Sequence, residues 1–200
     1  KAQITQIGGM SNKNFRIVLE GNDYVLRVPG IGADGMVERK NEEVNSQLGC
    51  KIGINPEILY FNSETGIKLA TFIKNAETLN SATIQRPDNM KKVAQILRNL
   101  HNSNVRLNNE FNIFHEIKKY EQLMEDVGGV MYEGWEDIRK DVMSLEGYLN
   151  NTLGVELHPC HNDLVPENFI KDENGKIYLI DWEYSGINDP MADLGGFYRR

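Results

Sequence analysis

The residues with the clearest capacity for chemistry lie near the C-terminal end of the chain. Asp163 and Asn168 stand in a segment that contains Pro166, which favours a loop over a helix. Asp181 follows the apolar run 177–180, and a strand of that composition would deliver its carboxylate to a cleft. An acid that accepts a hydroxyl proton, with an Asn and an Asp that hold Mg²⁺ against phosphate oxygens, is the set that phosphoryl transfer requires.

The order of these residues is more informative than any one of them, because isolated acidic loop residues are common. The pattern His-x-Asp-x-x-x-x-Asn runs from His161 to Asn168 and precedes the strand that delivers Asp181. We therefore predict a catalytic centre of Asp163, Asn168 and Asp181, in which Asn168 and Asp181 are the ligands of Mg²⁺. A zinc site is not favoured, because the spacing of Cys160 and the nearby histidines matches no closed zinc site.

A glycine-containing segment near the N-terminus is a candidate for holding the phosphates of a nucleotide. The segment 8–14 reads Gly-Gly-Met-Ser-Asn-Lys-Asn and is neither a Walker loop nor a strict G-x-G-x-x-G. Its glycines, Gly9 among them, permit close approach of the backbone, and Ser11 and Asn12 add hydrogen-bond donors. We predict that the segment precedes the first strand and binds phosphate oxygens.

A fixed cation follows on the second predicted strand. Arg27 would reach the α- and β-phosphate oxygens of a nucleotide, and a carboxylate on the next helix would orient its guanidinium. Glu42 and Glu43 are both placed to do so, and the residue pattern does not choose between them.

The elements that must position these residues begin with a strand-rich first part. Alternating polar and apolar residues predict strands at 15–20 and 24–28, joined as a hairpin by a Gly-Asn pair. The charged segment 37–48 predicts a helix, and the runs 58–61 and 67–73 predict a second hairpin.

The second part is mostly helical. Apolar residues at spacings of three and four predict helices at 90–101, 113–124 and 138–149, and the run 176–182 predicts the last strand. A β-rich lobe followed by an α-rich lobe, joined near 74–77, indicates an α+β protein with a cleft between the lobes.

Composition excludes several classes of protein. The 200 residues carry a net charge of −7, and 40% of them are hydrophobic, which suits a packed domain better than a disordered or fibrous chain. The acidic balance argues against nucleic-acid binding, and no apolar run is long enough for a membrane span. The first residues also lack the apolar core of a signal peptide. We expect a cytoplasmic protein whose cysteines, Cys50 and Cys160, are reduced.

Taken together, these segments resemble the choline/ethanolamine kinase family, in particular the bacterial choline kinases, within the aminoglycoside-phosphotransferase-like group of protein-kinase-like proteins. The matching segments span nearly the whole chain. They are Gly8-Gly9-x-Ser11-Asn12, the strand 24–30, Glu42-x-x-Asn45, Phe72-Ile73, the loop 161–168, Ile180-Asp181-Trp182-Glu183-Tyr184, Asn188-Asp189-Pro190 and Asp193-Leu194-Gly195.

The resemblance implies a bilobal protein-kinase-like fold that holds ATP between an N-terminal lobe, residues 1–75, and a C-terminal lobe, residues 76–200. It implies that Asp163 is the catalytic base and that Asn168 and Asp181 bind Mg²⁺. The residues that would contact ATP are Gly9, Ser11, Asn12, Arg27, Glu42, Phe72 and Ile73, of which Arg27 and Glu42 form the phosphate clamp and the last two line the adenine pocket. Because the family normally continues past Arg200, we also expect a C-terminally truncated chain.

Choline is the acceptor that the resemblance implies, with phosphocholine as the product. A quaternary ammonium group is bound by aromatic faces and a nearby carboxylate, so we predict that Glu183 and Tyr184 contact it while Asp163 contacts its hydroxyl. Further aromatic candidates are Trp182, Phe197 and Tyr198. The alternatives are a kinase for another small alcohol or amine, such as ethanolamine, thiamine or an aminoglycoside, and a catalytically silent nucleotide-binding module. The oligomeric state is not predicted.

Overall fold

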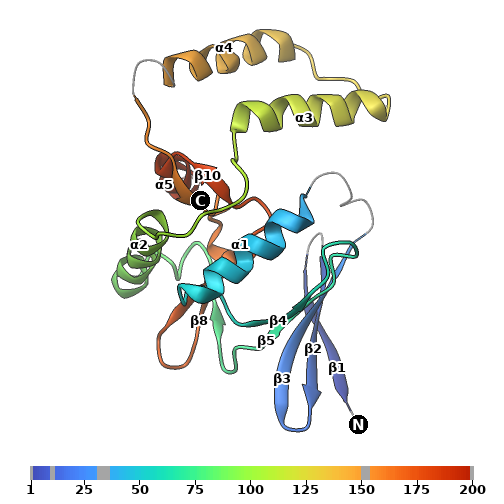
Figure 1. Ribbon diagram of the computed structural model, residues 1–200, viewed down its shortest axis with the longest axis vertical. Coiled ribbons are helices and arrows are strands. Elements are labelled where there is room, and N and C mark those ends of the chain that lie inside the picture. The colour runs from blue at the N-terminus through green and yellow to red at the C-terminus, as the bar shows by residue number, and fades with distance from the viewer. Residues whose placement is uncertain (1, 10–11, 31–36, 150–153, 199–200) are drawn as a thin grey trace.

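The N-terminal part of the molecule is an antiparallel sheet of five strands in the order β1-β2-β3-β5-β4 (Figure 1). The strands are β1 (Gln3–Gly8), β2 (Asn12–Leu19), β3 (Asn22–Pro29), β4 (Ile58–Phe61) and β5 (Lys68–Thr71). Both predicted hairpins are confirmed, but the turn of the first is Glu20-Gly21, with φ angles of 52° and 80°, and not the predicted Gly-Asn pair, since Asn22 already pairs with Leu19. The computed structural model describes residues 2–9, 12–30, 37–149 and 154–198.

The sequence analysis did not predict the strand β1. Its presence changes the predicted position of the segment 8–14 relative to the sheet. That segment follows β1 and leads into β2, so it does not precede the first strand of the sheet. Every residue of β1 is exposed, and a strand that buries neither face shows no alternation by which to find it.

The helix α1 (Arg39–Lys51) lies between the sheet and the helical part of the molecule (Figure 1). It begins and ends two to three residues later than the predicted 37–48. Its buried side is polar, because Glu42, Asn45 and Ser46 are all at most 1% exposed. Buried polar groups require hydrogen-bond partners, so this helix orients the side chains that it touches.

The C-terminal part has its core around the helix α2 (Pro87–His101), whose residues Val93, Leu97 and Leu100 pack with Phe169 and Leu179. Five short strands form two small sheets, ordered β6-β8-β9 and β10-β7. They are β6 (Glu77–Thr78), β7 (His158–Cys160), β8 (Phe169–Lys171), β9 (Ile177–Leu179) and β10 (Gly186–Asn188).

This arrangement corrects the prediction of a last strand at 176–182. The strand β9 covers only three of those residues, and β10 follows it. Asp181 therefore lies two residues beyond the end of a strand, in the turn that follows.

Three more helices complete the described part of the chain: α3 (Ile113–Asp126), α4 (Trp135–Tyr148) and α5 (Pro190–Tyr198). The helices α3 and α4 match their predicted positions and lie together at one end of the molecule (Figure 1). Their apolar faces are largely uncovered, since Ile138 and Leu145 of α4 are 50% and 51% exposed. Among the described residues, no helix is both long and apolar enough to span a bilayer.

Candidate active site

The structure brings Asp163 and Asn168 into direct contact. Both lie in the loop after β7, and a single 3₁₀ turn, Pro166–Asn168, folds the amide back onto the acid. Asn168 Nδ2 donates to the Asp163 backbone oxygen at 2.9 Å and to Asp163 Oδ2 at 3.1 Å. The Asn168 side chain thus fixes the orientation of the Asp163 carboxylate.

Asp181 is tied to the same loop through the backbone. The N–H of Ile180 donates to the Asn168 carbonyl at 2.9 Å, so the two predicted metal ligands are held next to each other. Asp181 has a φ of 65°, a conformation that costs a non-glycine residue about 1–2 kcal/mol. Its side chain remains 36% exposed and therefore accessible to a ligand.

His161 connects the loop 161–168 with the segment that follows β9. Its Nε2–H donates to the Ile180 carbonyl at 2.9 Å, and its ring lies edge-on to Trp182 with the ring centroids 5.2 Å apart. Complete burial lowers the pKa of His161, so the imidazole is neutral.

Asp193 anchors the catalytic loop from α5. Its two carboxylate oxygens accept the backbone N–H groups of Asn162 and His161 at 2.7 and 3.1 Å. The oxygen that binds His161 also lies 2.8 Å from Nε2 of His101 on α2. Asn162 itself has a φ of 65°, and this network holds the strained residue just before Asp163 in place.

A possible metal-ligand group at this anchor has a simpler interpretation. Within the described ranges, His101, Cys160 and Asp193 offer ligand atoms within 4.8 Å of one another. Both oxygens of Asp193 are already hydrogen-bonded, and burial raises the pKa of the Cys160 thiol and so disfavours the thiolate that binds metal. The group is a hydrogen-bonded anchor.

The glycine-containing segment reaches the acidic side of the site. Gly9 has a φ of 122°, and a Cβ there would lie 1.8 Å from the Asn12 carbonyl, so only glycine fits. Asn12 Nδ2 donates to Glu183 Oε1 at 3.2 Å. Ser11 lies outside the described residues.

Arg27 and Glu42 form a buried bidentate ion pair, with both N–O distances 2.6 Å. The structure thus selects Glu42 over Glu43. Arg27 Nη1 also lies 3.6 Å from Asp181 Oδ1, which places the cation at the edge of the catalytic centre. Burial lowers the pKa of Arg27, but Glu42 and then Asp181 outweigh that effect and raise it above its ordinary value.

Glu183 is the residue of this centre that resists ionisation. Burial, followed by the charge and hydrogen bond of Asp181 and the charge of Glu42, raises the pKa of Glu183 to about 8. Arg27 offsets only part of this effect. The carboxyl group is therefore mostly protonated at neutral pH in the ligand-free chain.

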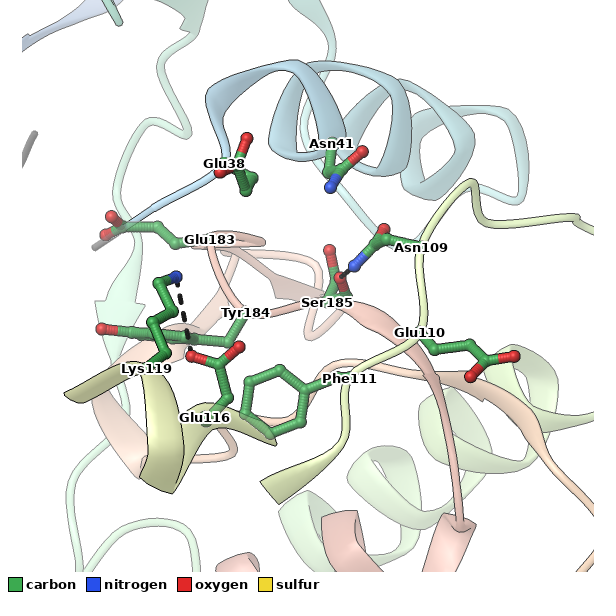
Figure 2. A pocket seen from close by; sticks show the side chains of 10 residues that line it. All are labelled: Glu38, Asn41, Asn109, Glu110, Phe111, Glu116, Lys119, Glu183, Tyr184 and Ser185. Carbon is green, nitrogen blue, oxygen red and sulfur yellow. Dashed lines mark hydrogen bonds and ion pairs between the residues drawn. The ribbon is translucent and has the colours of Figure 1, made fainter. Parts of the chain in front are cut away.

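A pocket opens beside Glu183 and Tyr184, as Figure 2 shows. Residues at the start of α1 lie on one side of it, and Glu116 and Lys119 from α3 lie on the other. Tyr184 lies edge-on to Phe111, with the ring centroids 6.3 Å apart, and burial raises the pKa of its hydroxyl. The lining is Glu38, Asn41, Asn109, Glu110, Phe111, Glu116, Lys119, Glu183, Tyr184 and Ser185, which includes four acids and one lysine.

The remaining predicted residues have other surroundings. Phe72 and Ile73 lie in the link between β5 and β6, and Arg16 stacks over the Phe72 ring at 4.6 Å from its centroid. Of the aromatic candidates for the acceptor, Trp182 is 1% exposed and so lines no binding surface, and Phe197 is partly buried and packs against the core. The Tyr198 side chain lies outside the described residues.

Two groups that hold the site together received no role in the sequence analysis, although Asn45 belongs to the matched segment Glu42-x-x-Asn45. Asn45 Nδ2 donates to Asn109 Oδ1 at 2.9 Å and to the Ser185 carbonyl at 3.0 Å, which joins α1 to the turn after Asp181. Lys68 contacts Glu42. The spacing of three residues between Glu42 and Asn45 puts both on one face of a helix, and this spacing could have indicated the first group. No such pattern surrounds Lys68, which is an isolated lysine at the end of a strand.

Comparison with known proteins places this site in a family. The model of the choline/ethanolamine kinase family matches residues 4–199. The chain belongs to the choline/ethanolamine kinase family. A curated member, Protein LicA of Haemophilus influenzae, is 33% identical over 192 residues, which are 95% of this chain and 56% of that protein.

Crystal structures of family members confirm the expected fold. The choline kinase LicA from Streptococcus pneumoniae matches with a TM-score of 0.88 and 40% identity, over 98% of this chain and 69% of that one. A structure of LicA in complex with AMP matches with a TM-score of 0.86 and 39% identity, over 100% of this chain and 69% of the other. The chain thus spans 56% of the first curated relative and about two thirds of the crystallised chains.

Proposed function

We propose that the chain transfers the γ-phosphoryl group of ATP to the hydroxyl of choline, giving phosphocholine and ADP. The observation that carries the proposal is the meeting of the Asp163–Asn168 loop and Asp181 with an Arg27–Glu42 pair, in a member of the choline/ethanolamine kinase family. The 40% identity to the choline kinase of S. pneumoniae supports the same reaction.

In this proposal Asp163 is the general base. As the choline oxygen bonds to the γ-phosphorus, Asp163 accepts the hydroxyl proton, the bond from that phosphorus to the β–γ bridging oxygen breaks, and ADP departs. The 3.1 Å hydrogen bond from Asn168 holds the carboxylate in one orientation for this transfer.

Asn168 and Asp181 would hold Mg²⁺, because a carboxamide oxygen and a carboxylate are the hard ligands that this ion prefers. The backbone hydrogen bond from Ile180 to Asn168 keeps the two ligands adjacent, which supports the assignment. Bound there, the ion would neutralise charge on the transferring phosphoryl group.

We assign the nucleotide to the cleft between an N-terminal lobe, residues 1–75, and a C-terminal lobe, residues 76–200. Gly9, Ser11 and Asn12 would contact phosphate oxygens with Arg27, while Phe72 and Ile73 would line the adenine. The AMP complex of LicA supports an adenine nucleotide as the ligand.

The acceptor would lie at the pocket beside Glu183 and Tyr184. Its other three acids, Glu38, Glu110 and Glu116, outnumber the one lysine and favour a cationic head group. The aromatic rings of Tyr184 and Phe111 suit a quaternary ammonium. Ethanolamine is also a cation, so it is the closest competitor of choline at this pocket.

The test is an ADP-release assay with choline, ethanolamine, thiamine and an aminoglycoside as acceptors. We expect the highest turnover with choline, and we expect Asp163→Asn to lower it about 10²–10⁴-fold while ATP binding, measured by calorimetry, is kept. Equal turnover on all acceptors would contradict the choline assignment. ATP binding without turnover in the unsubstituted chain would support the silent module instead.

A further inference from the structure

Lys68 contacts the carboxylate that orients the phosphate clamp. Its Nζ lies 2.9 Å from Glu42 Oε1, the same oxygen that accepts from Arg27 Nη1 at 2.6 Å. The side chains of Lys68 and Glu42 are 15% and 1% exposed, so water screens the contact weakly. One buried carboxylate therefore bridges two cations.

The register of the sheet places these cations side by side. Arg27 on β3 is the direct partner of Lys68 on β5, and Lys68 is the partner of Phe61 on β4. Like charges at opposed positions of two strands repel each other, so the pair needs the Glu42 carboxylate between them. The Phe61 ring adds cation–π contacts, with its centroid 5.5 Å from Arg27 Cζ and 5.6 Å from Lys68 Nζ.

The charge of Lys68 changes the net charge that the Arg27–Glu42 pair presents to a ligand. Arg27 and Glu42 alone would cancel and leave the neighbouring Asp181 carboxylate uncompensated, whereas Lys68 adds a second cation to this cluster. Burial would raise the pKa of Glu42, but the charge of Lys68 and the hydrogen bond of Arg27 outweigh it and hold that pKa below its ordinary value. Glu42 therefore stays ionised in the clamp.

Arg27 keeps unused donor capacity in this arrangement. Although only 6% of the residue is exposed, its Nε–H has no hydrogen-bond partner among the described residues. The Nε atom itself is enclosed, so an anionic ligand would be met at Nη1, which donates to Glu42 with only one of its two N–H groups. Asp181, 3.6 Å from Nη1, marks the side from which that anion would be met.

We propose that Lys68 is a positioning residue of the phosphate clamp, which compensates the charge of Glu42 so that Arg27 directs its own charge to the polyphosphate chain of a nucleotide. This inference rests on the proposed function. It requires that the contribution of Lys68 grow with the phosphate charge of the ligand. A purely structural role would weaken every adenine nucleotide equally.

The experiment measures dissociation constants of AMP, ADP and ATP by calorimetry in the presence of MgCl₂. Lys68→Met removes the charge and keeps most of the stem, Lys68→Arg keeps the charge, and Lys91→Met, at an exposed position of α2, makes the same change of net charge elsewhere. For Lys68→Met we expect affinity for ADP and ATP to fall about tenfold and affinity for AMP by less than about threefold. Lys68→Arg should restore most of the loss, and Lys91→Met should bind as the unsubstituted chain does.

Equal losses for the three nucleotides, or no loss for ATP, would overturn the inference while leaving the proposed function intact. If the unsubstituted chain binds none of the nucleotides, the proposed function and the inference both fail. Should Lys68→Met not fold, as judged by circular dichroism, Lys68→Gln provides the same comparison with a polar side-chain end.

Discussion

The pKa of Glu183 reflects its burial and the acidic groups around it in the site. Glu183 accepts a hydrogen bond from Asn12 and lies next to Asp181, so its carboxyl group keeps a proton at a pH where most glutamates have lost theirs. In the unfolded chain the same residue would titrate near the ordinary value of 4.5. Between that pH and about 8, the folded chain therefore binds more protons at Glu183 than the unfolded chain does.

This difference predicts how stability depends on pH in the absence of nucleotide and metal. The free energy of unfolding that Glu183 contributes is fully present below pH 4.5 and is lost as the pH rises through about 8. Glu183→Gln removes the titration. We expect the fall in Tm between pH 5.5 and 8.5 to be smaller by about 5–10 °C in this variant. Glu57→Gln, at an exposed position, serves as the control, and superimposable pH curves for Glu183→Gln and the unsubstituted chain would refute the prediction.

The residues of the candidate active site differ in how far they could be predicted from the sequence. Asp163, Asn168 and Asp181 followed from their order, because loop and strand signals flank them on both sides. The residue pattern did not separate Glu42 from Glu43, and only the resemblance pointed to Glu42, because the choice depends on which face of α1 meets Arg27 across the fold. Lys68 carried no signal, because its partner lies 26 positions away on another element.

The element that positions most of the site is α1, and its close approach depends on one glycine. A Cβ at Gly49 would lie 2.5 Å from Cζ2 of Trp182, a buried ring that follows Asp181 directly. Glu42 and Asn45 project from the same side of the helix and are buried with Gly49. The distance of α1 from Trp182 therefore sets how far Glu42 reaches toward Arg27.

Gly49→Ala should accordingly destabilise the chain although alanine favours helices. We expect the free energy of unfolding to fall by about 1–3 kcal/mol and the KM for ATP to rise, because the added methyl group pushes α1 away from the ring. Urea unfolding measures the first effect. Gly195→Ala in α5, where a Cβ meets open space, is the matched substitution and should leave stability unchanged or slightly raised; equal losses at both positions would argue against the packing explanation.

The helices and strands that could be predicted are those whose own residues show a clear hydrophobic pattern. The helices α2, α3 and α4 have strong amphipathic patterns, and the hairpin of β2 and β3 has clear alternation with a glycine turn. The strands β7 and β10 have three residues each and exist because these distant segments pair with each other. No local pattern of three residues could reveal such pairing.

On the scale of the whole molecule, polar contacts join the sheet part to the helical part beside the apolar packing of Ile54 against the C-terminal core. Asn12 reaches Glu183, Arg27 reaches Asp181, and the Leu179 N–H donates to the Ile54 carbonyl at 2.8 Å. Several of these contacts involve residues to which we assign ATP and Mg²⁺. A ligand bound there would join the two parts more strongly than the chain does alone.

Ligand addition and removal test this arrangement. ATP with Mg²⁺ at about 100 times its dissociation constant should raise Tm by about 5–10 °C, because it binds the folded chain only. Chelation of Mg²⁺ should reverse most of the shift, and Arg27→Met should reduce it in a thermal-shift assay. A shift of the same size with adenosine alone would show that the phosphate contacts contribute nothing.

The helix α4 is joined to α3 chiefly through Glu121, which accepts from Trp135 Nε1 at 2.9 Å and from Arg139 Nε at 2.5 Å. None of its described residues is buried. Such a helix is expected to unfold locally at a low free-energy cost. Its N–H groups would then exchange with solvent hydrogen while the sheet and the loop 161–168 stay folded. The two ends of the molecule would then differ in protection by orders of magnitude, with α2 and β9 reporting global unfolding and α4 reporting only its own.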